Sequence, residues 1–239
     1  MKRVFVLIVA LLGLPLLNIA FGQLTLDRTR VIFDREQSNS QSIVVENTNK
    51  NDPYLAQSWI EDERGNKIES PLVALPILQR INPGQEKQVK ISLVGQNTLP
   101  EDRESLLFFN VLGVPPKAEA ENQVSIVIQS KIKLFYRPKG LPKYPLNKSW
   151  IEEMGVENHG SSLMLTNPTA YHIIIFSLSR DNNRSVIEKD IILKPFSSET
   201  VHLKLGSTPT INVIDDYGAV KTLHYQCQAT SCRLRNSEE

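Results

Sequence analysis

Apolar and polar positions alternate in short runs along this chain. The runs are rich in Val, Ile, Leu and Phe, turn-forming residues separate them, and long helical periodicity is absent. Alternation with a period of two predicts β-strands. We expect strands at residues 24–33, 42–46, 54–61, 89–93, 106–112 and 124–136, and then at 154–157, 163–166, 172–178, 191–193, 199–203, 212–215 and 222–234. Short strands at this regular spacing indicate an all-β fold of the antiparallel sandwich type.

Proline and glycine divide these strands into two groups. Residues 137–147, with the sequence RPKGLPKYPLN, contain three prolines and a glycine, which is the composition of a linker. The sequence therefore predicts two domains, at 23–140 and 141–239, and each is long enough to bury a core of its own.

The first 22 residues have the layout of a secretory signal. Lys2 and Arg3 precede an apolar run at residues 4–17, and Ala20-Phe21-Gly22 forms a small-residue cleavage site. A single membrane anchor is the competing interpretation, but Pro15 and Asn18 interrupt a run that is already shorter than the roughly 20 apolar residues that cross a bilayer. We therefore expect export, cleavage and a mature chain that begins at Gln23.

The charge balance excludes one class of partner. Removing Lys2 and Arg3 from the 27 Lys and Arg residues leaves 25 against 26 Asp and Glu, so the mature chain has a net charge of −1. A nucleic-acid binder or a binder of anionic membranes needs a basic excess. We expect no nucleic-acid partner.

The two cysteines, Cys227 and Cys232, lie close together near the C-terminus. In an exported chain a local disulfide is the expected outcome. A zinc site is the alternative, but it needs more ligands, and only His224 lies near in sequence.

Residues 123–138, QVSIVIQSKIKLFYRP, contain an alternating apolar row that runs into a basic pair. Val124, Ile126 and Ile128 form the row, and Lys131 and Lys133 follow it. Such a strand has one apolar face. This face either fills the core of its own sandwich or is offered, through an unpaired edge, to another protein.

Catalytic patterns are missing from the sequence. It has no nucleophile elbow, no phosphate-binding glycine loop and no paired histidines at metal-ligand spacing. Paired acids such as Asp215-Asp216 more often shape turns or form ion pairs than catalyse. The histidines are scattered through the second half of the chain, at His159, His172, His202 and His224. We expect neither an enzyme nor a cofactor or metal.

Several segments, spread in order over nearly the whole mature chain, resemble the signature segments of PapD-like periplasmic pilus chaperones. They are 27–31 (DRTRV), 53–61 (PYLAQSWIE), 99–105 (LPEDRES), 131–138 (KIKLFYRP), 167–169 (NPT), 216–218 (DYG) and the Cys227/Cys232 pair. The resemblance implies two immunoglobulin-like β-sandwich domains in an angled, L-shaped arrangement, with a cleft that receives a pilus subunit. It implies a periplasmic chaperone whose partners are fimbrial subunits and an outer-membrane usher.

The resemblance also implies roles for individual residues. Arg30 and Lys133 match the two cations that bind the C-terminal carboxylate of the subunit. Val124, Ile126 and Ile128 match the row that enters the groove of the subunit, a mode of binding called donor-strand complementation.

A third group of matching residues would connect the two domains. Glu104, Arg137 and Asp216 correspond to a buried interdomain ion network, and their pairing would fix the angle between the domains. Three unrelated surface charges are the alternative. A strand with an exposed apolar edge also suggests a self-dimer when no subunit is bound.

The numbering of the strand poses a geometric question. The donor residues are even-numbered and Lys133 is odd-numbered, so a regular strand places them on opposite faces. Either a bulge between Ile128 and Lys133 changes the parity, or the strand passes from the groove to the cleft, where both faces are accessible.

Two other functions are compatible with a sandwich fold. A secreted immunoglobulin-like adhesion or structural module would pack Val124, Ile126 and Ile128 internally and would not need Arg30 or Lys133. A periplasmic hydrolase would need a pocket with a nucleophile and a base, for which the sequence offers no residues.

Overall fold

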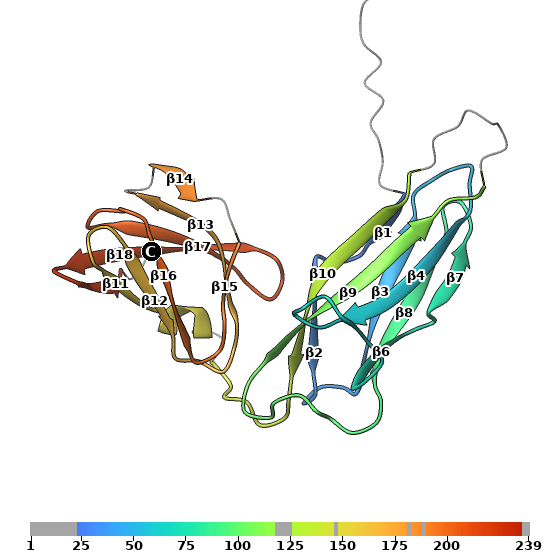
Figure 1. The fold of residues 1–239 in the computed structure, drawn as a ribbon, viewed down its shortest axis with the longest axis horizontal. Helices are drawn as coiled ribbons and strands as arrows, with labels where there is room; N and C mark the ends of the chain where they lie inside the picture. The colour runs from blue at the N-terminus through green and yellow to red at the C-terminus, as the bar shows by residue number, and fades with distance from the viewer. Residues whose placement is uncertain (1–22, 118–125, 146–147, 181–182, 188–189, 236–239) are drawn as a thin grey trace, which may run out of the picture.

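The chain forms two β-sheet bodies set at an angle to each other (Figure 1). The structure is a computed structural model that describes residues 23–117, 126–145, 148–180, 183–187 and 190–235. Domain one holds β1 to β10, and domain two holds η1 and β11 to β19. The predicted all-β, two-domain architecture is confirmed.

Domain one is a sandwich of two sheets. One sheet has the order β1-β3-β8-β6, and the other has the order β2-β10-β9-β4-β5 with β7 paired to β4. The strands are β1 (Leu24–Leu26), β2 (Arg30–Asp34), β3 (Ser40–Asn47), β4 (Tyr54–Glu61), β5 (Lys67–Ile68), β6 (Leu72–Leu75), β7 (Leu78–Ile81), β8 (Glu86–Leu93), β9 (Ser105–Val114) and β10 (Ile128–Arg137).

The core of domain one follows from strand alternation. In β4, Tyr54, Ala56, Ser58 and Ile60 are buried while the residues between them are partly or fully exposed. The inward rows of both sheets, including Phe33, Ile43, Ile91 and Phe109, meet in one cluster. A side-chain period of two places every second residue in this core.

Domain two is built around a strand that belongs to both of its sheets. The first part of β18 (Val220–Gln228) pairs with β17 (Pro209–Ile214), and its second part pairs with β19 (Ser231–Leu234). The other elements are η1 (Trp150–Glu153), β11 (Gly155–Asn158), β12 (Leu163–Asn167), β13 (Ile173–Arg180), β14 (Asn183–Ile187), β15 (Ile191–Leu193) and β16 (Ser197–Val201). The strand order is β14-β13-β17-β18-β19-β11-β12-β16, with β15 paired to β13.

Two predicted strands are each divided in the structure. The expected strand at 24–33 is β1 and β2, which lie in different sheets. Between them the Asp27 carboxylate accepts a hydrogen bond from the Val44 backbone N–H, and the chain crosses from one sheet to the other. The expected strand at 222–234 is the hairpin β18–β19, whose turn contains Ala229 at a positive φ of 52°.

The strands β5, β6, β7 and β14 and the short helix η1 were not predicted. Pro71 and Pro76 flank β6, and proline within an apolar run argues against a strand when the sequence is read alone. The structure accommodates β6 because it pairs on one side only, with β8.

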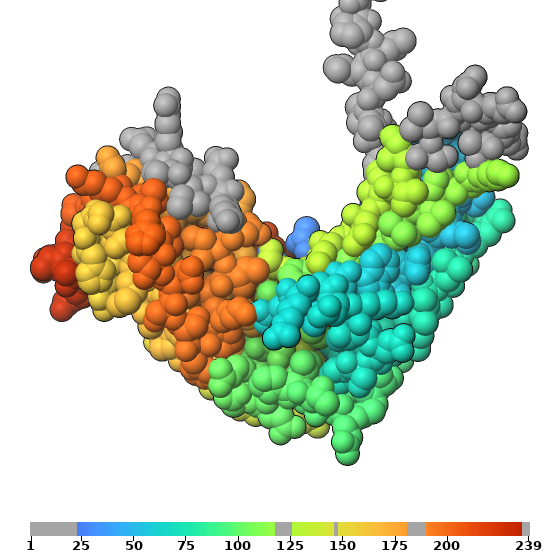
Figure 2. All heavy atoms as spheres, in the orientation of Figure 1, coloured from blue at the N-terminus to red at the C-terminus, as the bar shows by residue number. Residues whose placement is uncertain are grey.

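The two domains share an apolar contact at the base of the angle. Leu106 and Phe135 of domain one and Ile174 of domain two are buried together, and partly buried residues surround them: Ile32, Phe108, Ile192 and Ile214. β13 is therefore buried on both faces, because Ile173 and Ile175 enter the core of domain two while Ile174 contacts domain one. In the space-filling view the domains meet below and diverge above, leaving an open hollow (Figure 2).

Within the described ranges, no helix has both the length and the apolar character needed to span a bilayer.

Candidate functional site

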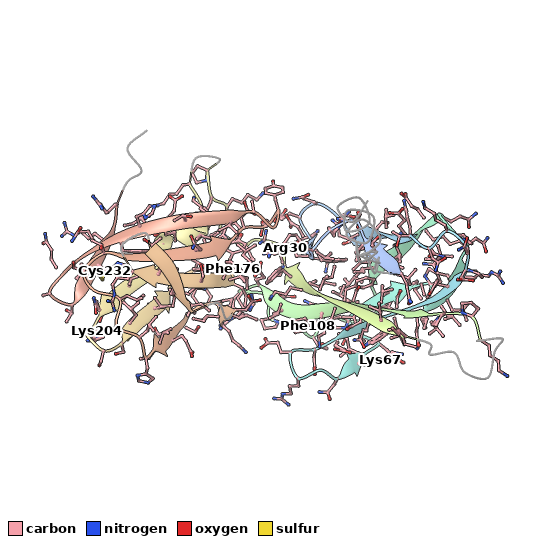
Figure 3. The ribbon with its side chains drawn as sticks, turned by 90° about the horizontal axis from the view of Figure 1, so that it is seen from above. Arg30, Lys67, Phe108, Phe176, Lys204 and Cys232 are labelled. Carbon is pink, nitrogen blue, oxygen red and sulfur yellow. A yellow bond between two sulfur atoms is a disulfide. The ribbon has the colours of Figure 1, made fainter. Side chains whose placement is uncertain are left out.

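The cleft brings Arg30 and Lys133 side by side. β2 and β10 are parallel neighbours, and Lys133 is the register partner of Arg30. Val31 and Phe33 on β2 and Leu134 on β10 face the core of domain one, so the residues that alternate with them point away from that core. Strand alternation therefore places both cations on the side of the sheet that faces domain two, where Figure 3 shows Arg30.

Arg30 has an unsatisfied donor in this cleft. Its Nε is buried, and it has no hydrogen-bond partner among the described residues. Burial lowers the pKa of Arg30, while the charges of Asp216, Asp215 and Asp190 act in the opposite direction. A buried donor on a charged group without a partner is costly, so the site is suited to an incoming anion.

A polar pocket of about 550 Å³ lies against Arg30 and takes its walls from both domains. Domain one contributes most of the lining, and domain two contributes Asp216 and Tyr217. The Tyr217 side chain is 94% exposed, so it extends from its turn into solvent at the pocket. The pocket is an open cleft floor of a size that admits the end of a polypeptide.

Lys133 is already paired in this structure. Its Nζ donates a hydrogen bond to Asp190 Oδ2 at 2.8 Å. Asp190 directly precedes β15 in domain two, so the ion pair spans the two domains. Neither the composition nor the motifs of the sequence indicated this contact.

The three residues of the expected ion network are in contact. Arg137 Nε donates to Glu104 Oε2 at 2.7 Å, and its Nη1 and Nη2 donate to the two carboxylate oxygens of Asp216, each at 2.7 Å. Glu104 is 1% exposed in its side chain and Arg137 is 12% exposed. Glu104 and Arg137 belong to domain one and Asp216 to domain two, so the network connects the domains through a bidentate, charge-assisted pair.

His172 extends this network and was missed by sequence reasoning, which treated it as one of four scattered histidines. Its backbone N–H donates to Glu104 Oε1 at 2.9 Å, and its ring Nδ1 lies 2.7 Å from the same oxygen. Burial acts to raise the pKa of Glu104, but the hydrogen bonds from His172 and the charge of Arg137 outweigh it and hold that pKa below its usual range.

Two aromatic rings complete the surroundings of Arg137. Its guanidinium lies 5.1 Å from the ring centroid of Trp150 and 4.9 Å from that of Tyr171. Burial acts to lower the pKa of Arg137, but the hydrogen bonds and charges of Asp216 and Glu104 raise it overall. The cation is therefore held by two carboxylates and two aromatic faces.

The apolar row before Lys133 is exposed where it is described. Ile126 is 61% exposed and Ile128 is 39% exposed, while Val124 lies outside the described residues. From Ile128 to Ile132, β10 pairs with β9 on one side, and no described strand pairs with its other edge until β2 joins at Lys133. In this chain alone, Ile126 and Ile128 do not fill the core of their own domain.

The pairing of β10 shows whether the even-numbered donor residues and Lys133 lie on opposite faces of the strand. Its register with β9 runs without a shift from Ile128 to Tyr136, so there is no bulge between Ile128 and Lys133 on this side. Alternation then places Ile128 on the core side, with Leu134, and Lys133 on the cleft side. Ile128 therefore lies on the same side of β10 as the core residues Leu134 and Tyr136, but at the exposed end of the strand.

The cysteines form the expected local disulfide. Cys227 and Cys232 are joined by an S–S bond of 2.01 Å, and they are register partners across the β18–β19 hairpin. The bond therefore closes a hairpin at the end of domain two, far from Arg30 (Figure 3).

An angled pair of β-sandwiches with two cations in the cleft and an exposed strand edge beside them defines a class of peptide-binding proteins. The family described as "Pili and flagellar-assembly chaperone, PapD N-terminal domain" matches residues 23–142, and "Pili assembly chaperone PapD, C-terminal domain" matches residues 149–225. This chain belongs to the PapD family of pilus-assembly chaperones, which are not enzymes, and the family predicted from the sequence is confirmed.

Individual relatives agree with this membership. The chain is 39% identical over 218 residues to "Probable fimbrial chaperone YfcS" of Escherichia coli K12, covering 90% of this chain and 87% of that protein. It is 34% identical over 236 residues to "Chaperone protein PapD" of Escherichia coli, covering 97% and 98%. Among solved structures, the periplasmic chaperone SfaE matches with a TM-score of 0.70 and 30% identity, covering 84% of this chain and 98% of that one.

Proposed function

We propose that this chain binds newly exported pilus subunits in its cleft, with Arg30 and Lys133 holding the C-terminal carboxylate of the subunit. The Nε of Arg30 carries the proposal, because no described residue satisfies it, Lys133 lies next to it in register, and the adjacent edge of β10 pairs with no described strand. A carboxylate offers two oxygens, and hydrogen bonds that involve a charged group each contribute about 1.5–3 kcal/mol.

The strand edge supplies the second part of the proposed binding. The backbone of β10 between Ile128 and Ile132 is available for strand addition, and Val124, Ile126 and Ile128 enter the groove of the subunit. Burying three such side chains contributes roughly 5–8 kcal/mol before ordering costs are subtracted. On this proposal the carboxylate fixes the register and the apolar row supplies affinity.

The cellular setting is proposed from the sequence and from the relatives. Residues 1–22 act as a cleaved export signal, and the mature chain works in the periplasm as two domains, 23–140 and 141–239. The similar protein SfaE is a periplasmic chaperone, and the 227–232 disulfide suits an oxidising compartment. No nucleotide, metal or other cofactor takes part.

Delivery to an outer-membrane usher requires a second surface that stays free while the cleft is filled. Domain one has exposed apolar side chains at Leu55, Leu75, Ile77 and Leu78. They lie on or beside β4, β6 and β7, and β7 is on the side of domain one away from domain two (Figure 1). This group fits a protein partner such as the usher. From Ile128 to Ile132 the outer edge of β10 pairs with no described strand, and this edge supports a self-dimer when no subunit is bound.

Subunit capture in the periplasm tests the proposal. Tagged wild type, Lys133→Ala and Lys131→Ala are each co-expressed with the subunits of the same gene cluster, and the captured subunit is quantified. Lys131 is the matched control, because it has the same charge and lies on the same strand, but it pairs with Glu61 of domain one and is not the register partner of Arg30. We expect loss of capture in Lys133→Ala alone, at equal folding. Full capture by that variant would contradict the anchor, and no capture by wild type would favour the adhesion module.

A further inference from the structure

Domain two supplies its own carboxylate to one of the two cleft cations. Asp190 Oδ2 accepts a hydrogen bond from Lys133 Nζ at 2.8 Å, and the side chains are 49% and 21% exposed. The pair joins residues 57 positions apart, one on β10 of domain one and one directly before β15 of domain two.

The neighbouring cation is in a different state. Arg30 is the register partner of Lys133, yet its Nε has no hydrogen-bond partner among the described residues. Asp190 influences Arg30 through its charge, together with Asp215 and Asp216. One cleft cation is therefore paired with a carboxylate of domain two, and the adjacent cation has a donor that no described residue engages.

The pair of Lys133 and Asp190 opposes the binding of a second carboxylate to Lys133. An ammonium has three donors and can contact two acceptors, but two carboxylates that share one site repel each other. If the subunit carboxylate is to reach both Arg30 and Lys133, Asp190 has to leave. Among the described residues its side chain bonds to Lys133, and its half-exposed position lets water replace that partner.

We propose that Asp190 is a resident carboxylate that holds Lys133 in place while the cleft is empty and is displaced by the C-terminal carboxylate of the subunit. The inference rests on the proposed carboxylate anchor and goes beyond it, because it assigns a competing residue in domain two. Asp190 positions Lys133 and lowers the affinity of the cleft for the subunit carboxylate.

The solvent exposure of the Lys133–Asp190 pair limits how much Asp190 can weaken subunit binding. Ion pairs near solvent shift an equilibrium by no more than about fivefold. Replacing Asp190 by Asn removes the competing charge and keeps the shape of the side chain. We therefore expect Asp190→Asn to capture subunit roughly two- to fivefold better than wild type.

A direct competition measures this ratio. Wild type and Asp190→Asn carry different tags and are co-expressed in one periplasm with a limiting amount of the major subunit of the same gene cluster, and the subunit bound to each is quantified. Glu63→Gln is the matched control, because the Lys194–Glu63 pair also joins the two domains at exposed positions but lies away from Arg30 and Lys133. Its capture ratio to wild type should be one.

A double variant separates competition from a structural role. If Asp190 acts through Lys133, adding Asp190→Asn to Lys133→Ala should restore no capture. Capture by Asp190→Asn that equals or falls below wild type would overturn the inference, and so would an effect that persists in the Lys133→Ala background. Retained capture by Lys133→Ala would instead overturn the anchor itself, so the two failures are distinguishable.

Discussion

Replacing Glu104 by Ala should destabilise the protein strongly, because this one carboxylate satisfies three donors at the domain junction. Oε2 accepts from Arg137 Nε at 2.7 Å, and Oε1 accepts from the His172 backbone N–H at 2.9 Å and lies 2.7 Å from the His172 ring Nδ1. With the Glu104 side chain only 1% exposed, water does not readily replace it. Removing one partner of a buried ion pair costs about 3–5 kcal/mol.

The expected change in melting temperature follows from this cost. For chains of 150–250 residues, each kcal/mol lowers Tm by about 2–4 °C, so Glu104→Ala should lower Tm by roughly 6–20 °C. Thermal unfolding followed by circular dichroism measures the shift. Asp102→Ala is the control, because Asp102 pairs with its sequence neighbour Arg103 and is 61% exposed, and it should leave Tm unchanged. A Tm for Glu104→Ala that equals that of the control would refute this reasoning.

Three further predictions concern pH, the turn at the cleft and the donor strand. The folded state holds the pKa of Glu104 below its ordinary value of 4.5, so the contribution of Glu104 to the free energy of unfolding is complete above about pH 4.5 and is lost as pH falls through the lowered pKa. Chemical denaturation between about pH 7 and about pH 3 should therefore show a smaller loss of stability in Glu104→Gln than in wild type. Equal losses would count against this. Gly218→Ala places a Cβ 2.8 Å from Thr29 Oγ1 at φ +86°, whereas the Cβ of Gly140→Ala, at φ +81°, meets nothing within 4 Å. Both variants bear the cost of a left-handed backbone, about 1–2 kcal/mol, so the Tm of Gly218→Ala should be the lower of the two. A Tm for Gly218→Ala no lower than that of Gly140→Ala would contradict the close approach. Ile128→Ser should reduce subunit capture with little change in Tm, since Ile128 is 39% exposed, and wild-type capture would argue against strand donation.

Local pattern was sufficient for much of the fold. The expected strand at 54–61 agrees with β4 at both ends, because its buried and exposed positions alternate without interruption. The split of 24–33 into β1 and β2 was not predictable in the same way. The polar residues 27–30 interrupt the apolar run, but the crossing between sheets depends on a contact of Asp27 with Val44, which is distant in sequence.

In the candidate site, too, some residues could be predicted from the sequence and others could not. Five residues came from motifs that resemble a family: Arg30, Lys133, Glu104, Arg137 and Asp216. The structure places the first two side by side on neighbouring strands and joins the other three in one ion network. Composition and spacing alone would have left them as surface charges.

Asp190 and His172 were missed because neither belongs to a motif and both act across the domain junction. Their partners are 57 and 68 positions away in the chain. Such contacts depend on the angle between the domains, which no local pattern encodes. Sequence reasoning would have needed the register of β10 and the packing of β13 to find them.

The most direct test of the account asks whether the cleft recognises a terminal carboxylate. A fluorescent peptide that copies the C-terminal strand of the major subunit of the same gene cluster is prepared as the free acid and as the amide, and binding of each to the purified full-length mature chain is measured by anisotropy. Loss of charge-assisted hydrogen bonds should weaken the amide by at least about tenfold. Equal affinity for acid and amide would contradict the assignment of Arg30 and Lys133 as the carboxylate anchor.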